Sequence, residues 1–262
     1  MKYVVSQKAL DAIERECRSH PGTETGGIIV GYRDESLVTV THATGPGINW
    51  EKSARHFVKD TEYLQMVLNR LFQYFQVNYL GVWHKHPSAM PYPSSGDVVS
   101  AMEEVSDNKL RLEELIAPIC VIRGSKVSVI PYVIKDDAFA QIIWQPTPHE
   151  RLTNAAALDI QWYTRTVGQE RLAEELERFR ENGVEAYLRK GIDGTYRFHA
   201  PLGSGSNLIM VCPLEYPVFP PEIALYGDKD NHYEPVASNI LDTWSIYQYL
   251  ADLVEEQRRN LY

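Results

Sequence analysis

The sequence lacks paired cysteines, long apolar runs and clustered basic residues, and each absence excludes a class of protein. Its three cysteines, Cys17, Cys120 and Cys212, form no CxxC pair and are an odd number. That usage is typical of reduced thiols in a cytosolic protein rather than of a disulfide framework. A metal site in this chain would therefore depend on histidine and carboxylate ligands.

The chain also lacks the features of membrane, secreted and nucleic-acid-binding proteins. No stretch approaches the ~18 consecutive apolar residues of a membrane span, and the start MKYVVSQKAL has no signal-peptide core. Lys and Arg total 26 against 35 Asp and Glu, a net charge of −9, with no basic cluster to meet phosphates. We therefore expect a cytoplasmic protein with no membrane and no nucleic-acid partner.

The length of 262 residues favours two domains. Periodicity and turn residues predict an α/β domain over residues 1–143, a Pro-rich linker over 144–152 and an α+β domain over 153–262. The elements expected in the first domain are helices over 6–20, 60–76 and 94–105 and strands over 26–32, 37–43, 79–86, 117–122 and 126–134. Those of the second are a helix over 153–182 that Gly168 could interrupt, strands over 185–190, 195–200 and 207–212, a fourth strand after the prolines of YPVFPPEIALYG, and a helix over 246–259.

The segment GVWHKHPSAMPYPSSGD, residues 81–97, contains the polar end of the strand expected over 79–86 and the loop after it. Side chains at i and i+2 of a strand share a face, so His84 and His86 can present two imidazoles to one point while Lys85 faces away. The prolines in the loop 87–93 exclude helix and central strand and can bring Asp97 back as a third ligand. Two imidazoles and one carboxylate are a ligand set of catalytic zinc, with the fourth position left to water.

Hydrolysis of an amide at such a site needs two more groups. A carboxylate that is not a ligand must move the proton of the water, and Glu24 in TETGG is the candidate. A donor must meet the oxyanion, and the hydroxyl of Ser94 is close enough in sequence to Asp97 to serve. Taken singly, each residue has a commoner explanation: a structural histidine, a solvated Glu24, and a helix cap for Ser94.

Together these residues form a more specific pattern. Glu24, then His84-x-His86, seven residues and Ser94-x-x-Asp97, resembles the JAMM motif of the JAB/MPN+ family of zinc isopeptidases. The resemblance covers about residues 1–140 and implies an MPN/JAB-type mixed sheet with flanking helices. It implies one zinc ion on His84, His86 and Asp97, with Glu24 as acid/base and Ser94 as oxyanion donor.

The resemblance also implies a substrate. Members of the family cleave isopeptide or peptide bonds after the C-terminal glycine of ubiquitin-like proteins, in deconjugation or precursor processing. Lys85 departs from the serine of many eukaryotic members and looks like bacterial ones. We therefore expect as partners a ubiquitin-like protein and its conjugates, together with activating or conjugating enzymes of a bacterial conjugation or defence system.

The second domain resembles a different fold. The prolines of Tyr216-Pro217-x-x-Pro220-Pro221, between the third and fourth strands, are similar to those of the ubiquitin-conjugating and RWD-type fold. No cysteine follows Cys212, and the segment similar to that around the active cysteine offers Ala237 or Ser238. The resemblance implies a non-catalytic conjugating-like domain that supports the first domain or docks a ubiquitin-like protein.

Two other functions stay open. One is a binding or adaptor module for ubiquitin-like proteins with little turnover, which the missing cysteine of the second domain favours. The other keeps the metal chemistry and changes the substrate, to a small amide or to a sulfur-carrier protein that is trimmed.

Overall fold

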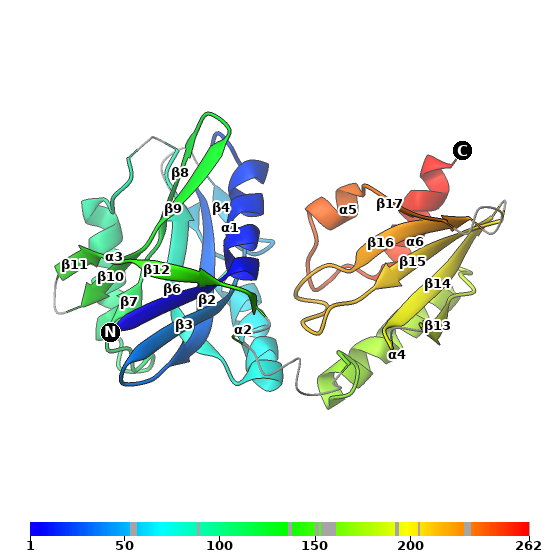
Figure 1. Cartoon of the computed structure of the whole chain (residues 1–262), viewed down its shortest axis with the longest axis horizontal. Coiled ribbons are helices and arrows are strands. Elements are labelled where there is room, and N and C mark those ends of the chain that lie inside the picture. The colour runs from blue at the N-terminus through cyan, green and yellow to red at the C-terminus, as the bar shows by residue number, and fades with distance from the viewer. Residues whose placement is uncertain are drawn as a thin grey trace. The chain divides into compact units, whose positions relative to one another are not determined.

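The computed structural model describes residues 1–52, 57–87, 90–135, 138–149, 152, 161–191, 194–203, 205–227 and 232–261. The chain forms two compact units, Met1–Ala157 and Leu158–Tyr262. Both are drawn in Figure 1. Within the described ranges, no helix combines the length and the apolar character that crossing a bilayer requires.

The first unit is built around a mixed ten-stranded sheet in the order β11-β10-β7-β6-β2-β3-β1-β12, with β8 beside β6 and β9 beside β8. The sheet combines parallel pairs, such as β1 with β3 and β6 with β8, and antiparallel pairs, such as β2 with β6. Its strands are β1 (Lys2–Ser6), β2 (Thr25–Arg33), β3 (Leu37–Ala43), β6 (Asn78–Lys85), β7 (Leu115–Ile116), β8 (Ile119–Arg123), β9 (Lys126–Ile130), β10 (Tyr132–Lys135), β11 (Ala138–Gln141) and β12 (Trp144–Thr147), and β4 (Glu51–Lys52) and β5 (Phe57–Val58) form a separate pair. The expected mixed α/β sheet is confirmed, and Figure 1 shows it curled.

Three helices flank this sheet: α1 (Gln7–Ser19), α2 (Thr61–Phe75) and α3 (Ser95–Ser106). The Ser6 side chain caps α1 by accepting the N–H of Ala9, as expected of a serine before an amphipathic run. Helices α1 and α3 cover opposite faces, as the two core clusters show (Figure 1). The α1 cluster includes Ala9, Ile13, Cys17, Trp83, Ile116 and Cys120, and the α3 cluster includes Ala101, Leu115, Ala117 and Ile134.

The linker prediction is wrong at its start. Residues Trp144–Thr147 form β12, which pairs in parallel with β1, and Trp144 packs against the α1 core. The proline of this segment, Pro146, lies on a strand at the edge of the sheet, where a missing N–H is tolerated. Residues 150 and 151 of the predicted linker lie outside the described residues.

Two strand predictions also need correction. The single strand expected over 126–134 is broken at Pro131 into β9, which pairs with β8, and β10, which pairs with β7 and β11. Proline cannot donate to a ladder, so the chain changes partner there. The strand expected to reach His86 ends at Lys85, although the His86 N–H still donates to the carbonyl of Cys120 at 2.9 Å.

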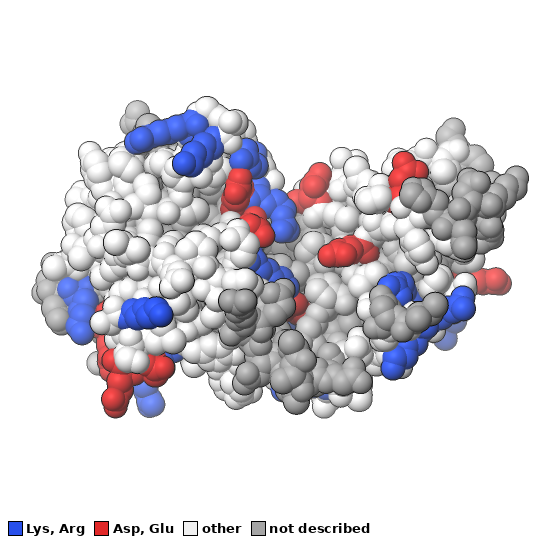
Figure 2. Space-filling view, in the orientation of Figure 1, with Lys and Arg blue, Asp and Glu red and all other residues white. Residues whose placement is uncertain are grey.

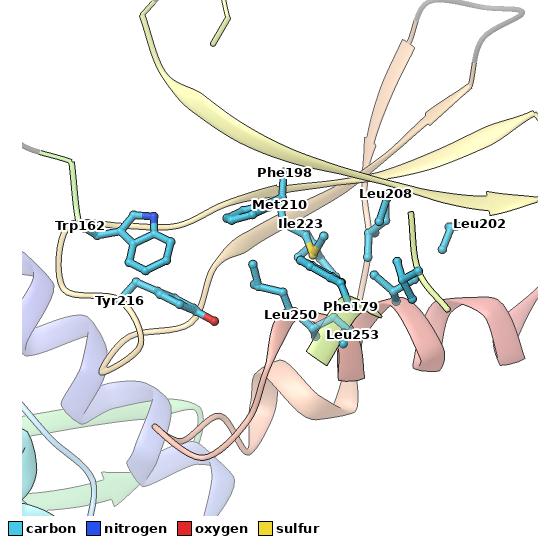
Figure 3. Packing of buried hydrophobic residues seen from close by; sticks show 14 residues of the cluster. Trp162, Phe179, Phe198, Leu202, Leu208, Met210, Tyr216, Ile223, Leu250 and Leu253 are labelled. Carbon is cyan, nitrogen blue, oxygen red and sulfur yellow. The ribbon is translucent and has the colours of Figure 1, made fainter. Parts of the chain in front are cut away.

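The second unit is an antiparallel meander, β13 to β17 in sequence order, with helices on one face. Its elements are α4 (Thr166–Glu181), β13 (Tyr187–Lys190), β14 (Tyr196–Gly203), β15 (Ser206–Val211), β16 (Glu222–Gly227), β17 (His232–Pro235), α5 (Asn239–Asp242) and α6 (Leu250–Asn260). The α+β class and the strand order are those expected, with β17 as a fifth strand that the sequence did not indicate. Figure 3 shows its core, in which Phe179, Phe198 and Leu250 meet between sheet and helices, beside Trp162 and Tyr216.

The helices of this unit are shorter than expected. Residues 153–160 of the first predicted helix lie outside the described residues, and α4 begins at Thr166 and runs through Gly168 without interruption. The last helix begins at Leu250 instead of 246, after the short α5. Tyr249 is its N-cap residue, and its backbone N–H donates to Asp252 at 2.8 Å.

A buried ion pair ties α4 to the rest of the second unit. Arg171 Nε donates to Glu175 at 2.7 Å, and both residues are almost fully buried. Arg171 also donates to the carbonyls of Ile246 and Gln248, and its guanidinium lies 4.0 Å from the centre of the Tyr249 ring. Burial with these partners makes the pair a structural element of the helix layer.

The surface of the first unit does not concentrate charge of one sign on the face seen in Figure 2. Basic and acidic side chains lie in small separate groups over its described part, with uncharged surface between them.

Candidate metal centre

The first two predicted ligands lie where β6 ends in the middle of the sheet. Strand β6 pairs with β2 on one side and β8 on the other, so that Gly26 and Ile119 both stand opposite His84. The backbone N–H of His84 donates to the carbonyl of Pro118 at 3.1 Å. His84 is thus held by backbone pairing on both sides, and the N–H of His86 donates to the carbonyl of Cys120 on β8. These backbone contacts fix both positions before any metal binds.

The structure brings the three predicted ligands together. The Nε2 atoms of His84 and His86 are 2.9 Å apart, Asp97 Oδ1 is 3.2 Å from His84 Nε2, and Asp97 Oδ2 is 3.2 Å from His86 Nε2. A tetrahedral ion with bonds of about 2.0–2.2 Å needs ligand atoms about 3.3–3.6 Å apart. Outward shifts of a few tenths of an ångström, about the width of thermal motion, would admit such an ion.

A hydrogen bond at the far side of the His86 ring selects the tautomer that a metal needs. His86 Nδ1 lies 2.9 Å from the carbonyl oxygen of Met90, an acceptor to which only a protonated ring nitrogen can donate. The proton at Nδ1 leaves the lone pair of Nε2 free for a cation. His86 is 5% exposed, so the ring is both oriented and shielded.

Asp97 has a structural task besides its position beside the histidines. Its side chain accepts the N–H of Ser94 at 2.6 Å and thereby completes a capping box at the start of α3. Although burial opposes the shift, hydrogen bonds from both histidines hold the pKa of Asp97 well below its usual range. The carboxylate is therefore an anion fixed at a helix N-terminus, which suits a cation ligand.

The electrostatics of His86 fit the same picture. Burial lowers its pKa, but the hydrogen bonds to Asp97 and Met90 and the charges of Asp97 and Glu24 outweigh burial and raise it. The surroundings therefore favour positive charge at the point where the three side chains converge. A bound cation would supply that charge without a proton.

The loop between the predicted ligands is anchored by a residue that the sequence did not indicate. Residues 88 and 89 lie outside the described residues, but Tyr132 of β10 donates its hydroxyl to the carbonyl of Pro91 at 2.9 Å. Nothing in the pattern around Tyr132 indicated this contact, because it joins segments 41 residues apart. The contact supports the return of the chain toward Asp97.

Glu24 lies one residue before β2, near the predicted ligands. Its neighbours on the strand fix its direction: Thr25 pairs with Lys85 and Gly26 with His84. Alternation along an extended chain then directs Glu24 to the face of His84 rather than that of Lys85. Gly27 is required nearby for a different reason, since a Cβ there would lie 2.0 Å from the carbonyl oxygen of Thr44.

Ser94 is the N-cap residue of α3. Its Oγ accepts the N–H of Asp97 at 3.3 Å, in an extended backbone conformation. A hydroxyl that accepts at one lone pair still has its proton to donate. The position beside Asp97 is compatible with a donor role toward a bound substrate, which stays a prediction.

The second unit carries no thiol in the position that the conjugating resemblance indicated. Ser238 there donates its hydroxyl to Glu256 and accepts the N–H of Leu241 at 3.2 Å, as the cap of α5. Cys212 directly follows β15 and is partly buried against the core of the second unit, and burial raises its thiol pKa well above the ordinary value. The described surroundings of Ser238 and Cys212 are those of structural residues rather than nucleophiles.

Comparisons with known proteins agree with the fold of the first unit. The family model described as prokaryotic homologs of the JAB domain matches residues 6–137. A protein named CD-NTase/cGAS isopeptidase from Escherichia coli (strain TW11681) is 32% identical over 83 residues, which are 31% of this chain and 53% of that protein. A protein of the same name from Enterobacter hormaechei subsp. hoffmannii (strain UCI 50) is 27% identical over 123 residues, 46% of this chain and 66% of that protein.

The chain thus spans between about half and two thirds of the length of these curated relatives. A solution structure of a protein from Desulfitobacterium hafniense is 20% identical and has a TM-score of 0.45, covering 56% of this chain and 93% of that one, which is too distant to carry an argument. The family match covers just over half of the chain and coincides with the sheet that positions His84, His86 and Asp97. The chain belongs to the family of prokaryotic homologues of the JAB domain.

Proposed function

We propose that this protein is a zinc-dependent isopeptidase or peptidase that cleaves after the C-terminal glycine of a ubiquitin-like protein. The observation that carries the proposal is the convergence of three side chains: the Nε2 atoms of His84 and His86 are 2.9 Å apart, and each lies 3.2 Å from a different carboxylate oxygen of Asp97. The hydrogen bond from His86 to Met90 supports a ligand role over a purely structural one.

The donor set fits zinc. Two imidazole nitrogens and one carboxylate are ligands of catalytic zinc sites, and the thiols of this chain do not join them. Bound there, zinc would polarise a scissile carbonyl and make water a better nucleophile near neutral pH. His84, His86 and Asp97 would hold it, and the capped start of α3 would keep Asp97 oriented.

Two further side chains would transfer the proton and stabilise the developing negative charge. Glu24, on the same face, would take the proton of the attacking water and deliver it to the leaving nitrogen. Ser94 would donate its hydroxyl to the oxygen that gains negative charge, while its own lone pair holds the N–H of Asp97. Both assignments rest on placement and chemistry.

The relatives support the choice of substrate. Proteins named CD-NTase/cGAS isopeptidase are 27–32% identical to parts of this chain, so we infer an isopeptide bond to a ubiquitin-like protein as the substrate. Conjugates of that protein, and the enzymes that activate and attach it, are the partners of such an activity. We propose a bacterial conjugation or defence system as the setting, since both relatives come from bacteria.

The second unit is proposed as a ubiquitin-conjugating-like domain without catalysis. Its support is the meander with flanking helices and the buried, hydrogen-bonded Ser238 where an active cysteine would stand. In this role residues 153–262 would dock the ubiquitin-like protein or its conjugating enzyme, and residues 1–143 would cut. Binding by the second unit with no cleavage by the full chain would favour the adaptor function instead.

The test uses the full chain and linear fusions of several bacterial ubiquitin-like proteins and of ubiquitin to a fluorescent protein. We expect about one zinc per chain by plasma mass spectrometry and cleavage after the terminal glycine of at least one fusion. Glu24→Gln should keep the zinc and lose cleavage by at least about 100-fold, as expected for loss of a general acid/base. Glu35→Gln, at an exposed position of the same unit, is the control and should cleave normally.

Two results would contradict this function. A Glu24→Gln protein that cleaves at the wild-type rate would remove the assigned mechanism. Absence of bound zinc after purification and after zinc addition would remove the metal centre. Cleavage of short Gly-Gly amides but of no folded fusion would move the substrate to the small-amide class.

A further inference from the structure

Lys85, which separates the two histidine ligands, has an unusual environment for a lysine. It is 0% exposed and among the largest fully buried side chains of the described residues. It lies on the face of the sheet opposite to the metal ligands, in register with Thr25 on β2 and Cys120 on β8. Such complete burial of a lysine is rare, because its charged head is normally kept in water.

The ammonium of Lys85 reaches the turn that leads to Glu24. Its Nζ donates to the backbone carbonyl of Pro21 at 3.3 Å. Pro21 lies three residues before Glu24, and Thr25, directly after Glu24, is the register partner of Lys85. One side chain on β6 therefore holds the segment that carries Glu24 from the side opposite to the active face.

A second tie holds the same segment. The hydroxyl of Thr25 donates to Glu16 Oε1 at 2.6 Å, and the same carboxylate lies 2.8 Å from His20 Nδ1. Glu16 is on α1, so its carboxylate contacts the residue before the turn, His20, and the residue after it, Thr25. Glu24 is thereby left between two anchored points, with its side chain directed to the metal face.

Burial of this lysine has an energetic cost that packing does not explain. The side chain takes its ammonium out of water on the face that also carries the buried thiols of Cys17 and Cys120. An apolar side chain of similar length would fill the same space beside the thiols without desolvating a cation. The hydrogen bond from Lys85 to the Pro21 carbonyl therefore indicates a role for Lys85 in positioning the segment that contains Pro21.

We propose that Lys85 is a positioning residue for Glu24: by holding the Pro21 carbonyl, it fixes the turn 21–24 so that the Glu24 carboxylate stays at the metal face. The inference rests on the proposed function, because it presupposes that Glu24 transfers protons. Lys85, between the two histidines, would thus position Glu24, which neither histidine does.

The test compares Lys85→Met, which keeps length and removes the donor, with Lys126→Met, at an exposed lysine of the same unit. Misplacement of a reacting group by about 1 Å costs up to about 100-fold in rate, so we expect kcat of Lys85→Met to fall about 10- to 100-fold. The KM for the fusion that wild type cleaves fastest and the zinc content should stay within about twofold. Hydrogen exchange of residues 20–25 should be faster than in wild type, and Lys126→Met should match wild type in every measurement.

A double-mutant cycle separates positioning from general support. If Lys85 acts through Glu24, the single-turnover rate of Lys85→Met with Glu24→Gln should equal that of Glu24→Gln alone. Additive losses, or a loss of zinc in Lys85→Met that matches the loss of rate, would overturn the proposal. An unchanged kcat in Lys85→Met would also overturn it.

Two safeguards keep the outcome decisive. If Lys85→Met does not fold, Lys85→Gln replaces it, because glutamine keeps an N–H donor on a shorter stem. We expect Lys85→Gln to fold, to lose less than about 10-fold in kcat and to exchange hydrogen at residues 20–25 faster than wild type. A Lys85→Gln protein with the kcat and the exchange rates of wild type would overturn the proposal. If wild type cleaves and Glu24→Gln does not, while Lys85→Met is normal, the positioning role alone fails. If wild type binds no zinc or cleaves no fusion, the proposed function fails, and this role with it.

Discussion

Ser94 has two separable tasks in this account, and a pair of substitutions can distinguish them. Its Oγ caps α3 by accepting the N–H of Asp97, and its O–H is assigned to the substrate oxyanion. Ser94→Ala removes both. Ser94→Gly also removes the hydroxyl, but glycine at an N-cap costs only a few tenths of a kcal/mol, whereas alanine costs about 0.5–2 kcal/mol.

The magnitudes for the two variants follow from the geometry. The cap bond is long, at 3.3 Å, so we expect Ser94→Ala to lower the free energy of unfolding by about 0.5–1 kcal/mol, the lower part of the range for caps. Loss of one oxyanion donor costs about 100- to 1,000-fold in kcat. Both variants should therefore lose activity equally, while only the alanine variant loses measurable stability.

The assays are urea denaturation of the zinc-free protein and initial rates on the cleaved fusion. Ser94→Thr keeps a hydroxyl and a cap, so it serves as the control and should lose less than about tenfold in rate. A Ser94→Gly protein with near-normal kcat would refute the oxyanion role and leave Ser94 as a cap alone. Loss of zinc from either variant would show that the cap acts through Asp97.

Two further predictions concern stability. Arg171→Met takes the cation from the buried Glu175 and should destabilise the chain by about 3–5 kcal/mol in urea denaturation. Adding Glu175→Leu should recover only part of the loss, because it removes the acceptor of the Leu250 N–H and of the Tyr216 hydroxyl; a single variant as stable as wild type would contradict this. Gly27→Ala forces a Cβ to 2.0 Å from the carbonyl oxygen of Thr44, so it should lower the free energy of unfolding by about 1–3 kcal/mol and lower the zinc content. Gly22→Ala, with open space around the added Cβ, is the control and should change neither quantity. Equal stability of the two alanine variants would show that the strand adapts.

The elements that the sequence predicted well are those defined by local chemistry. Serine before an apolar 3.6-residue pattern marked the start of α1, and Asp60 and Gln76 bound α2 as its caps. Strand β3 matches the expected range 37–43. The approach of His84 and His86 also followed from the strand period, because i and i+2 share a face.

The features that the sequence did not predict depend on partners far along the chain. Strand β12 exists because β1 pairs with it about 140 residues away, and its Pro-rich composition indicated a linker instead. The Tyr132 contact to Pro91 and the Lys85 contact to Pro21 both reach a backbone carbonyl, which leaves no trace in residue type. The direction of Lys85 followed from alternation, but its complete burial did not, since alternation does not tell how well the opposite face is covered.

The central claim is that a metal on His84, His86 and Asp97 performs the cleavage. Its most direct test is to remove metal from the full chain with a chelator, dialyse, and add zinc back in steps while both cleavage of the fusion and bound zinc are measured. The account predicts no cleavage without metal and full recovery at about one zinc per chain, with no recovery in an Asp97→Ala protein. Cleavage at the wild-type rate by the metal-free chain would contradict it.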